Sequence, residues 1–207
     1  MTPSGGQNGR PEVVDLRALL HRPGPGNHRT TIELDGRAIE TLADLPPARG
    51  RLLFVGLNPS TVSVHAGHYH QGRLGRLFWR RLIKAGILPA GTDLDSADDS
   101  LVAAGHGITD LIKRPTPRDV ATNGELTAGV GPLWQKVALW RPGAVVFVYK
   151  RGASIAAARP LPQRWGQLQG VAIGGRPCFL MPGPYAPASE VGPGLNLLRN
   201  LNAALPD

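Results

Sequence analysis

Short apolar runs alternate with helix-like segments along most of the chain. A run such as AVVFVY at 144–149 has no polar alternation, so it predicts a strand that is buried on both faces. The predicted strands are 51–56, 107–112, 144–149, 171–173 and 178–181, and the predicted helices are 74–85, 126–139 and 195–205. Buried strands separated by helices are typical of an α/β fold. We therefore predict a three-layer α/β/α sandwich around a short, mostly parallel sheet.

The N-terminal part of the chain lacks these apolar runs and is rich in Gly, Pro and Asn. We expect a flexible N-terminal extension over 1–30 and a single domain over 31–207, since 207 residues suit one ordinary domain. The domain begins with two strand-like segments, 31–34 and 37–41, on either side of Asp35-Gly36. This pair favours the type I′ turn of a β-hairpin.

Charge narrows the range of partners. The chain has 23 Lys+Arg against 15 Asp+Glu, a net charge of +8, which favours a polyanion such as nucleic acid or an anionic membrane surface. No apolar run reaches the roughly 18–20 residues of a membrane span. The N-terminus has no apolar signal core, so we expect a cytosolic protein without a membrane partner.

In the predicted helix 74–85, Leu74, Leu77, Phe78 and Leu82 share one face, and the opposite, basic face carries Arg73, Arg76, Arg80, Arg81 and Lys84.

Cysteine and histidine usage bears on metal and redox chemistry. The single cysteine, Cys178, excludes disulfides within the chain and thiolate metal sites, and its apolar neighbours predict a core residue. Three histidines, His65, His68 and His70, fall within six residues, but no carboxylate or cysteine lies nearby in sequence to complete a site. We therefore predict no metal and no cofactor. Tyr69 or His70 is better suited to stack on a base.

The loop 56–60 (GLNPS) follows a predicted buried strand, where a nucleotide-binding enzyme would have its phosphate loop. It lacks the glycine spacing and the lysine of such a loop. It is either a strand-ending turn or the position of a buried asparagine, Asn58, whose amide could hold a water. Ligands of open parallel sheets bind at the carboxyl ends of the strands, so we expect the loops 57–72 and 181–187 to meet there.

Several segments in the same order resemble one family. Residues 54–60 (FVGLNPS) are similar to the Gly-Ile-Asn-Pro-Gly motif of the mismatch-specific uracil-DNA glycosylase/thymine-DNA glycosylase family, within the uracil-DNA glycosylase superfamily. Two features depart from that pattern: Ser60 replaces a glycine, and the second motif, Asn-Pro-Ser-Gly-Leu in bacterial members, appears as Met-Pro-Gly-Pro-Tyr at 181–185. The similarity spans about 50–205, and its other segments are 67–72 with Phe78-Trp79, 107–109 with 114–116, Glu125-Leu126, Arg141-Pro142 and Trp165-Gly166.

The resemblance implies a monofunctional hydrolase of DNA base excision repair, a monomer that flips uracil out of G·U pairs in double-stranded DNA. Mispaired thymine and other damaged pyrimidines are further candidate substrates. Hydrolysis of the N-glycosidic bond would leave an abasic site, with Asn58 positioning the water. The resemblance, read with the charge pattern, places the base pocket at Gly56, Leu57, Ser60, His68, Tyr69 and His70, the DNA wedge at Pro182, Gly183, Pro184 and Tyr185, and the DNA-backbone contacts at Arg73, Arg76, Lys150 and Arg151.

An amide cannot accept the proton of the attacking water, so a carboxylate is also sought. Asp93 is the candidate base. The alternative is that its acidic segment is a solvated loop with helix-capping acids before Leu101. Two other functions stay open: a non-catalytic module that binds damaged DNA, and a hydrolase of free nucleosides. The sequence also leaves open the range of bases, the need for an opposite guanine and activity on single strands.

Overall fold

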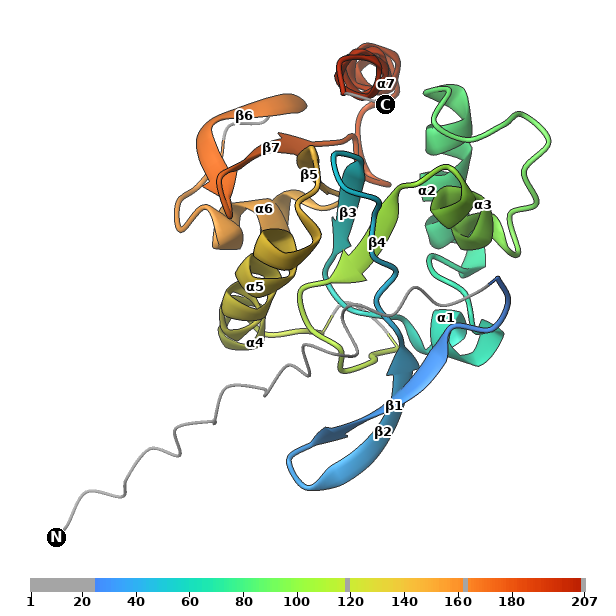
Figure 1. Cartoon of the computed structure of the whole chain (residues 1–207), viewed down its shortest axis with the longest axis vertical. Helices are drawn as coiled ribbons and strands as arrows, with labels where there is room; N and C mark the ends of the chain where they lie inside the picture. Colours follow the sequence, from blue (N-terminus) through green and yellow to red (C-terminus); the bar gives the residue numbers. More distant parts are fainter. Residues whose placement is uncertain (1–24, 118–119, 162–163, 206–207) are drawn as a thin grey trace, which may run out of the picture.

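The computed structural model describes residues 25–117, 120–161 and 164–205 (Figure 1). Within these residues a five-stranded sheet has the order β4-β3-β5-β7-β6. Neighbouring strands are parallel, except that β6 is antiparallel to β7. The predicted mostly parallel sheet is confirmed. Its strands are β3 (Leu52–Gly56), β4 (Gly107–Asp110), β5 (Ala144–Phe147), β6 (Gly166–Ile173) and β7 (Arg176–Leu180).

Helices cover both faces of this sheet (Figure 1). In β3 the side chains alternate, with Leu52 and Phe54 in one core cluster and Leu53 and Val55 in the other. The first cluster packs against α2 (Gly72–Lys84), α3 (Ala97–Ala103) and α7 (Ala188–Ala203), and the second against α4 (Asn123–Ala128), α5 (Val130–Trp140) and α6 (Lys150–Ala156). The three-layer α/β/α fold is therefore confirmed.

The predicted hairpin is also present, as β1 (Arg29–Leu34) and β2 (Arg37–Leu42). Asp35 has φ 51 and Gly36 has φ 72, the two left-handed positions that a type I′ turn requires. Within the described residues the two strands pair only with each other, and they lie below the main sheet in Figure 1.

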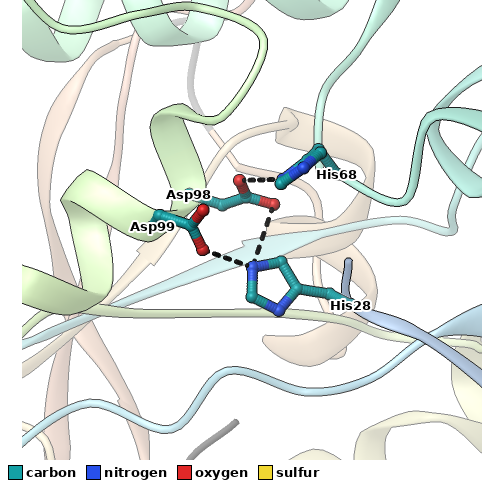
Figure 2. A group of neighbouring side chains, drawn as sticks. All are labelled: His28, His68, Asp98 and Asp99. Atoms are coloured by element: carbon teal, nitrogen blue, oxygen red, sulfur yellow. Dashed lines mark hydrogen bonds and ion pairs between the residues drawn. The ribbon is translucent and has the colours of Figure 1, made fainter. Parts of the chain in front are cut away.

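The N-terminal segment before this hairpin packs on the domain from residue 25 onward, whereas residues 1–24 of the expected extension lie outside the described residues. The amide of Gly26 donates to the Asp99 carboxylate, and the amide of His28 donates to the carbonyl of Gly67. His28 itself is only 2% exposed and reaches toward α3 (Figure 2).

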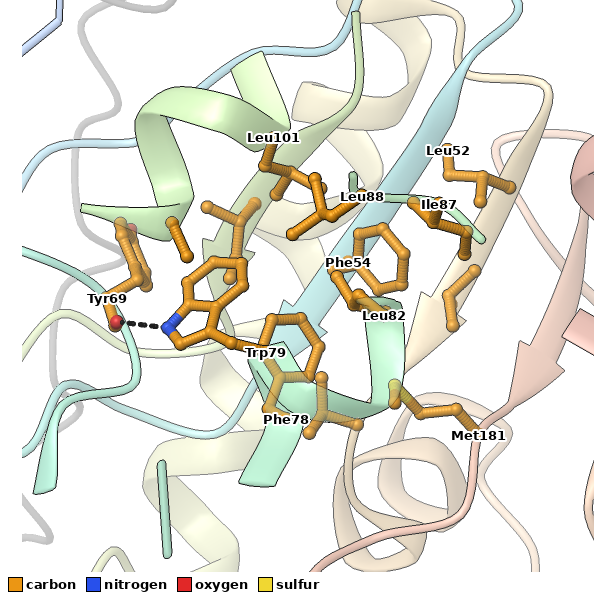
Figure 3. Close-up of a cluster of buried hydrophobic side chains, with 14 of the residues drawn as sticks. Leu52, Phe54, Tyr69, Phe78, Trp79, Leu82, Ile87, Leu88, Leu101 and Met181 are labelled. Atoms are coloured by element: carbon orange, nitrogen blue, oxygen red, sulfur yellow. Dashed lines mark hydrogen bonds between the residues drawn. The ribbon is translucent and has the colours of Figure 1, made fainter. Parts of the chain in front are cut away.

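The buried face of α2 differs from the one predicted. Phe78, Trp79 and Leu82 are buried, but Leu74 is 39% exposed. The indole of Trp79 donates to the carbonyl of Tyr69 at 3.0 Å and packs edge-on against Phe78 (Figure 3). This hydrogen bond lets the large ring enter the core without an unpaired N–H group.

Other helices also differ from the prediction, at prolines and where a helix is short. The predicted helix 126–139 is two helices, α4 and α5, because Pro132 has no N–H to donate to the carbonyl of Ala128. The last helix begins at Ala188 and contains Pro193. Short α1 (Thr61–Ala66) and α6 have no clear signal in the sequence.

Cys178 is 1% exposed in the core, as predicted, and burial raises the pKa of its thiol to about 12. In the part of the chain that the structure describes, no helix has both the length and the apolar character needed to cross a membrane.

Candidate active site

A cleft of about 800 Å³ opens at the carboxyl ends of the parallel strands. Its walls come from the loop after β3, the end of β4, the start of α6 after β5, and the loop after β7. This confirms that segments from 57–72 and 181–187 meet. The lining includes Leu57, Asn58, Ser60, Tyr69, His70, Arg73, Asp110, Tyr149, Lys150, Arg151, Pro184 and Tyr185.

The amide of Asn58 has one possible orientation. Its Nδ2 donates to the hydroxyl of Thr116 at 2.7 Å and to the carbonyl of Pro59 at 3.1 Å, and lies 3.4 Å from the carbonyl of Arg114. Two of these three neighbours can only accept, so the nitrogen and not the oxygen must face them. The Oδ1 atom is therefore the end of the amide that can accept a hydrogen bond from a water in the cleft.

Ser60, where the family motif has glycine, caps α1. Its hydroxyl accepts from the amide of Ser63 at 3.1 Å and donates to the Ser63 hydroxyl at 2.9 Å. The Ser63 hydroxyl in turn accepts from the amide of Gln71 at 3.0 Å. The serine thus links the first motif to the loop that precedes α2, and its hydroxyl is used by the protein itself.

Asp110, the last residue of β4, was not among the sequence-predicted site residues. It lies opposite Gly56 in the sheet, and a Cβ at position 56 would collide with its carboxylate. The side chain is buried, and among the described residues no group hydrogen-bonds to its Oδ2. The only sequence signal was a carboxylate at the end of an otherwise apolar strand.

Burial is the main reason that the pKa of Asp110 rises to about 7. The cations Lys113 and Lys136 lower this pKa and the anion Asp44 raises it, but burial outweighs the cations. Asp110 is thus a carboxyl group that changes charge near neutral pH inside the cleft.

An ion network lies directly behind Asp110. The carboxylate of Asp44 contacts Lys113 at 2.5 Å and Lys136 at 2.8 Å, and accepts from the Thr109 hydroxyl at 2.5 Å. Burial by itself raises the pKa of Asp44, but the two ammonium groups hold it far below the usual range. Lys113 also donates to the Tyr69 hydroxyl at 3.0 Å. When Asp110 is ionised, the ammonium groups of Lys113 and Lys136 are therefore balanced by the carboxylates of Asp44 and Asp110.

His70 is a neutral histidine on the wall of the cleft. Burial lowers the pKa of its imidazole to about 4, and its ring lies 4.3 Å from that of Phe78, centroid to centroid. Its Nε2 is buried, without a hydrogen-bond partner among the described residues. The backbone of His70 has φ 52, and Gly75 allows α2 to pass close to it because a Cβ there would collide with the His70 carbonyl.

Of the other residues predicted for the base pocket, some line the cleft and one does not. Tyr69 reaches the cleft from the core, where it is 2% exposed and its hydroxyl donates to the carbonyl of Ala43 at 2.9 Å. His68 does not line the cleft, because its Nδ1 lies 2.7 Å from the carboxylate of Asp98. Gly56 flanks the cleft through its contact with Asp110.

The predicted wedge and cationic residues lie around the opening. Pro184 and Tyr185 are on the rim, and Tyr185 is 83% exposed. The loop before them is anchored, since Arg81 donates to the carbonyl of Pro182 at 2.7 Å and the Gly183 carbonyl accepts from Ala186 at 2.8 Å. Of the predicted DNA-backbone cations, Arg73, Lys150 and Arg151 line the cleft, and Arg76 instead forms an ion pair with Asp95.

The structure does not bring Asp93 to the cleft. Its side chain is exposed, and its carboxylate accepts from the amide of Asp95 at 3.0 Å and lies 3.4 Å from the Ser96 hydroxyl. These contacts lie within the exposed loop before α3, as the alternative of a solvated loop expects. The expected cap is not formed, because no side chain caps the N-terminus of α3, but Asp98 and Asp99 lie in its first turn.

Replacing Asp110 with asparagine should change how stability depends on pH. The folded pKa lies above the unfolded value of 3.8, so the folded parent binds an extra proton between these values and loses stability as the pH rises from about 4 to 7. Asp110→Asn does not titrate. Its free energy of unfolding, relative to the parent, should therefore rise by up to roughly 4 kcal/mol across this range. Urea unfolding at several pH values measures it, and a constant difference would show that Asp110 is ordinarily solvated.

A comparison with known protein families gives a match that covers the loops lining the cleft. A family model described as Uracil DNA glycosylase superfamily matches residues 43–185, which include the loop of Asn58, the end of β4 and the loop of Tyr185. A search of curated proteins gives no match. The match supports a hydrolytic DNA glycosylase of base excision repair, with DNA as its partner. The chain belongs to the uracil DNA glycosylase superfamily.

Proposed function

We propose that this protein is a monofunctional, mismatch-specific glycosylase that removes uracil from G·U pairs in double-stranded DNA, acting as a monomer. The observation that carries the proposal is the fixed amide of Asn58, whose Nδ2 is held by Thr116 and Pro59 while its carbonyl oxygen is left for a water. A polar group that is preorganised in this way stabilises a transition state without having to reorganise.

Binding would begin with the cationic rim. Arg73, Lys150 and Arg151 line the opening and suit the phosphates on either side of a flipped nucleotide. The Pro-rich loop would then fill the vacated stack with Tyr185, which is exposed on a loop held by Arg81. The mispaired target lowers the cost of flipping, because a mismatched base is held less firmly in the duplex.

The chemical step breaks the C1′–N1 bond, and the base leaves with the bonding electron pair. The water oxygen forms the new bond to C1′ while Asn58 Oδ1 accepts a hydrogen bond from that water. One water proton passes to the ionised Asp110 carboxylate, which lines the same cleft and whose Oδ2 has no hydrogen-bond partner among the described residues. The neutral imidazole of His70 can donate from Nε2 to an oxygen of the leaving base.

Asn58→Ala should lower the single-turnover rate on a G·U duplex by roughly 10²–10³, the range seen when one preorganised polar group is lost. Duplex binding should persist because the rim cations remain. The assay is alkali cleavage of a labelled duplex after incubation, with exposed Asn200→Ala as the matched control. A parent protein that leaves uracil DNA intact would favour a binding module, and one that cuts only deoxyuridine would favour a nucleoside hydrolase. Strand cleavage without alkali would contradict a monofunctional enzyme.

The excision rate should follow the ionisation of Asp110. A base must be deprotonated to act, so the rate should fall about tenfold per pH unit as the pH drops below about 7. Asp110→Asn should be slower by roughly 10²–10⁴ at the plateau and should lose this inflection. Asp93→Asn is the control, and it should keep the profile of the parent. If the inflection moves with Asp93 and not with Asp110, the base has been misassigned.

Tyr185→Ala should weaken binding to duplex product by about 5- to 150-fold, because stacking on an aromatic side chain contributes roughly 1–3 kcal/mol. Excision from duplex should fall more than excision from single strands, where no stack has to be refilled. Trp134→Ala removes another exposed aromatic, on α5 and outside the cleft, and should change neither. Equal losses on both substrates would place Tyr185 in the base pocket.

A further inference from the structure

Outside the cleft, four side chains with metal-binding atoms converge at the loop 67–71 between α1 and α2, called the pocket loop below (Figure 2). His28 comes from the segment before β1, His68 from the loop before α2, and Asp98 and Asp99 from the first turn of α3. One ligand atom of each lies within 4.8 Å of all the others. No carboxylate lies near His68 along the chain, and the fold brings two to it from about 30 residues further on.

The distances within this cluster suit a single metal ion. His68 Nδ1 lies 2.7 Å from Asp98 Oδ1, and His28 Nε2 lies 2.8 Å from Asp99 Oδ1 and 3.9 Å from Asp98 Oδ2. Zinc binds imidazole nitrogen and carboxylate oxygen at about 2.0–2.2 Å, which places the ligand atoms of a tetrahedral site roughly 3.4 Å apart. Shifts of about an ångström would therefore bring all four atoms onto one ion.

Hydrogen bonds from His68 and the Tyr69 amide satisfy the oxygens of Asp98, but they do not neutralise the two neighbouring carboxylates. Both carboxylates are directed at the same nitrogen, His28 Nε2, which carries at most one proton. At 2.8 Å the proton serves Asp99, so the 3.9 Å approach of Asp98 gains no hydrogen bond from His28. A divalent cation would satisfy both carboxylates, and with two neutral imidazoles it would bring the net charge of the cluster to zero.

The surroundings of the cluster resemble those of a built metal site. The side chains of His28 and Asp98 are 1% and 0% exposed, so the ion would be enclosed by protein. Backbone amides orient both carboxylates: Tyr69 donates to Asp98 Oδ2 at 2.8 Å, and Gly26 donates to both oxygens of Asp99 at 3.0 and 3.1 Å. Such outer contacts fix the direction of metal ligands.

We propose that His28, His68, Asp98 and Asp99 bind one divalent transition-metal ion of the zinc class in a closed, four-ligand structural site. Two imidazoles and two carboxylates, with no position left for water, favour zinc over the larger hard cations, which take six or more oxygen ligands. The ion would fasten the N-terminal segment and α3 to the pocket loop, directly beside Tyr69 and His70. It takes no part in the chemistry of the cleft.

The test uses the whole chain, stripped with a chelator and then dialysed against zinc sulfate. The parent should retain one zinc per chain by elemental analysis, and zinc at a hundred times its dissociation constant should raise the melting temperature by roughly 5–10 °C. Cobalt(II) in place of zinc should give the intense visible absorption of a tetrahedral site.

His68→Gln and Asp99→Asn should each lower zinc affinity by at least about 100-fold, since even outer-contact losses cost 10- to 100-fold. His65→Gln, on the exposed side of α1, is the matched control and should bind zinc as the parent does. A parent that retains no zinc, or zinc that binds and stabilises His68→Gln and Asp99→Asn as it does the parent, would overturn the proposal. The four side chains would then form only a hydrogen-bonded ion-pair network. These readouts do not depend on glycosylase activity.

Discussion

The candidate site depends on a set of hydrogen bonds, called the clasp below, that joins the loop after β3 to Thr116 in the segment after β4. Asn58 Nδ2 donates to the Thr116 hydroxyl at 2.7 Å, Thr116 donates its amide to the Pro59 carbonyl at 3.1 Å, and Thr61 donates to the Thr116 carbonyl at 3.2 Å. These bonds occupy the side-chain nitrogen of Asn58, so its side-chain oxygen is the atom left to face the cleft. Because the loop is held from two sides, the cleft has a preformed shape, as a binding site with precisely placed polar groups requires.

The second constraint is the balance of buried charge behind that clasp. Lys113 and Lys136 both contact Asp44, which lies between β2 and β3. One carboxylate does not neutralise two ammonium groups, so the network favours a second anion nearby, and Asp110 is the side chain in position to supply it. Burial opposes that charge. The opposition of these two effects brings the pKa of Asp110 to about 7, which suits a general base.

The features that could be predicted from the sequence depend on local patterns and on the motif in the loop 56–60. Apolar runs predicted the sheet, Asp35-Gly36 predicted the hairpin turn, and the Asn-Pro turn after β3 pointed to Asn58 at the cleft. It missed what depends on contacts between distant segments. Asp110 lies at the end of a short buried strand, and its raised pKa comes mainly from burial, which outweighs the opposing charges of Lys113 and Lys136. The indole N–H of Trp79 can be buried because it donates to the Tyr69 carbonyl, a contact that no periodicity encodes.

The pocket loop connects these features because three successive side chains face three environments. His68 points to the carboxylate of Asp98, Tyr69 enters the core to meet Lys113, and His70, with its positive φ, turns back to the cleft. Because the three residues are consecutive, the position of each one limits where the backbone of the other two can lie. The Asp98 carboxylate holds the loop at the His68 side chain and at the Tyr69 amide, and the Tyr69 hydroxyl contacts Lys113 of the charge network. The positions of the cleft residues Tyr69 and His70 thus depend on contacts that lie outside the cleft.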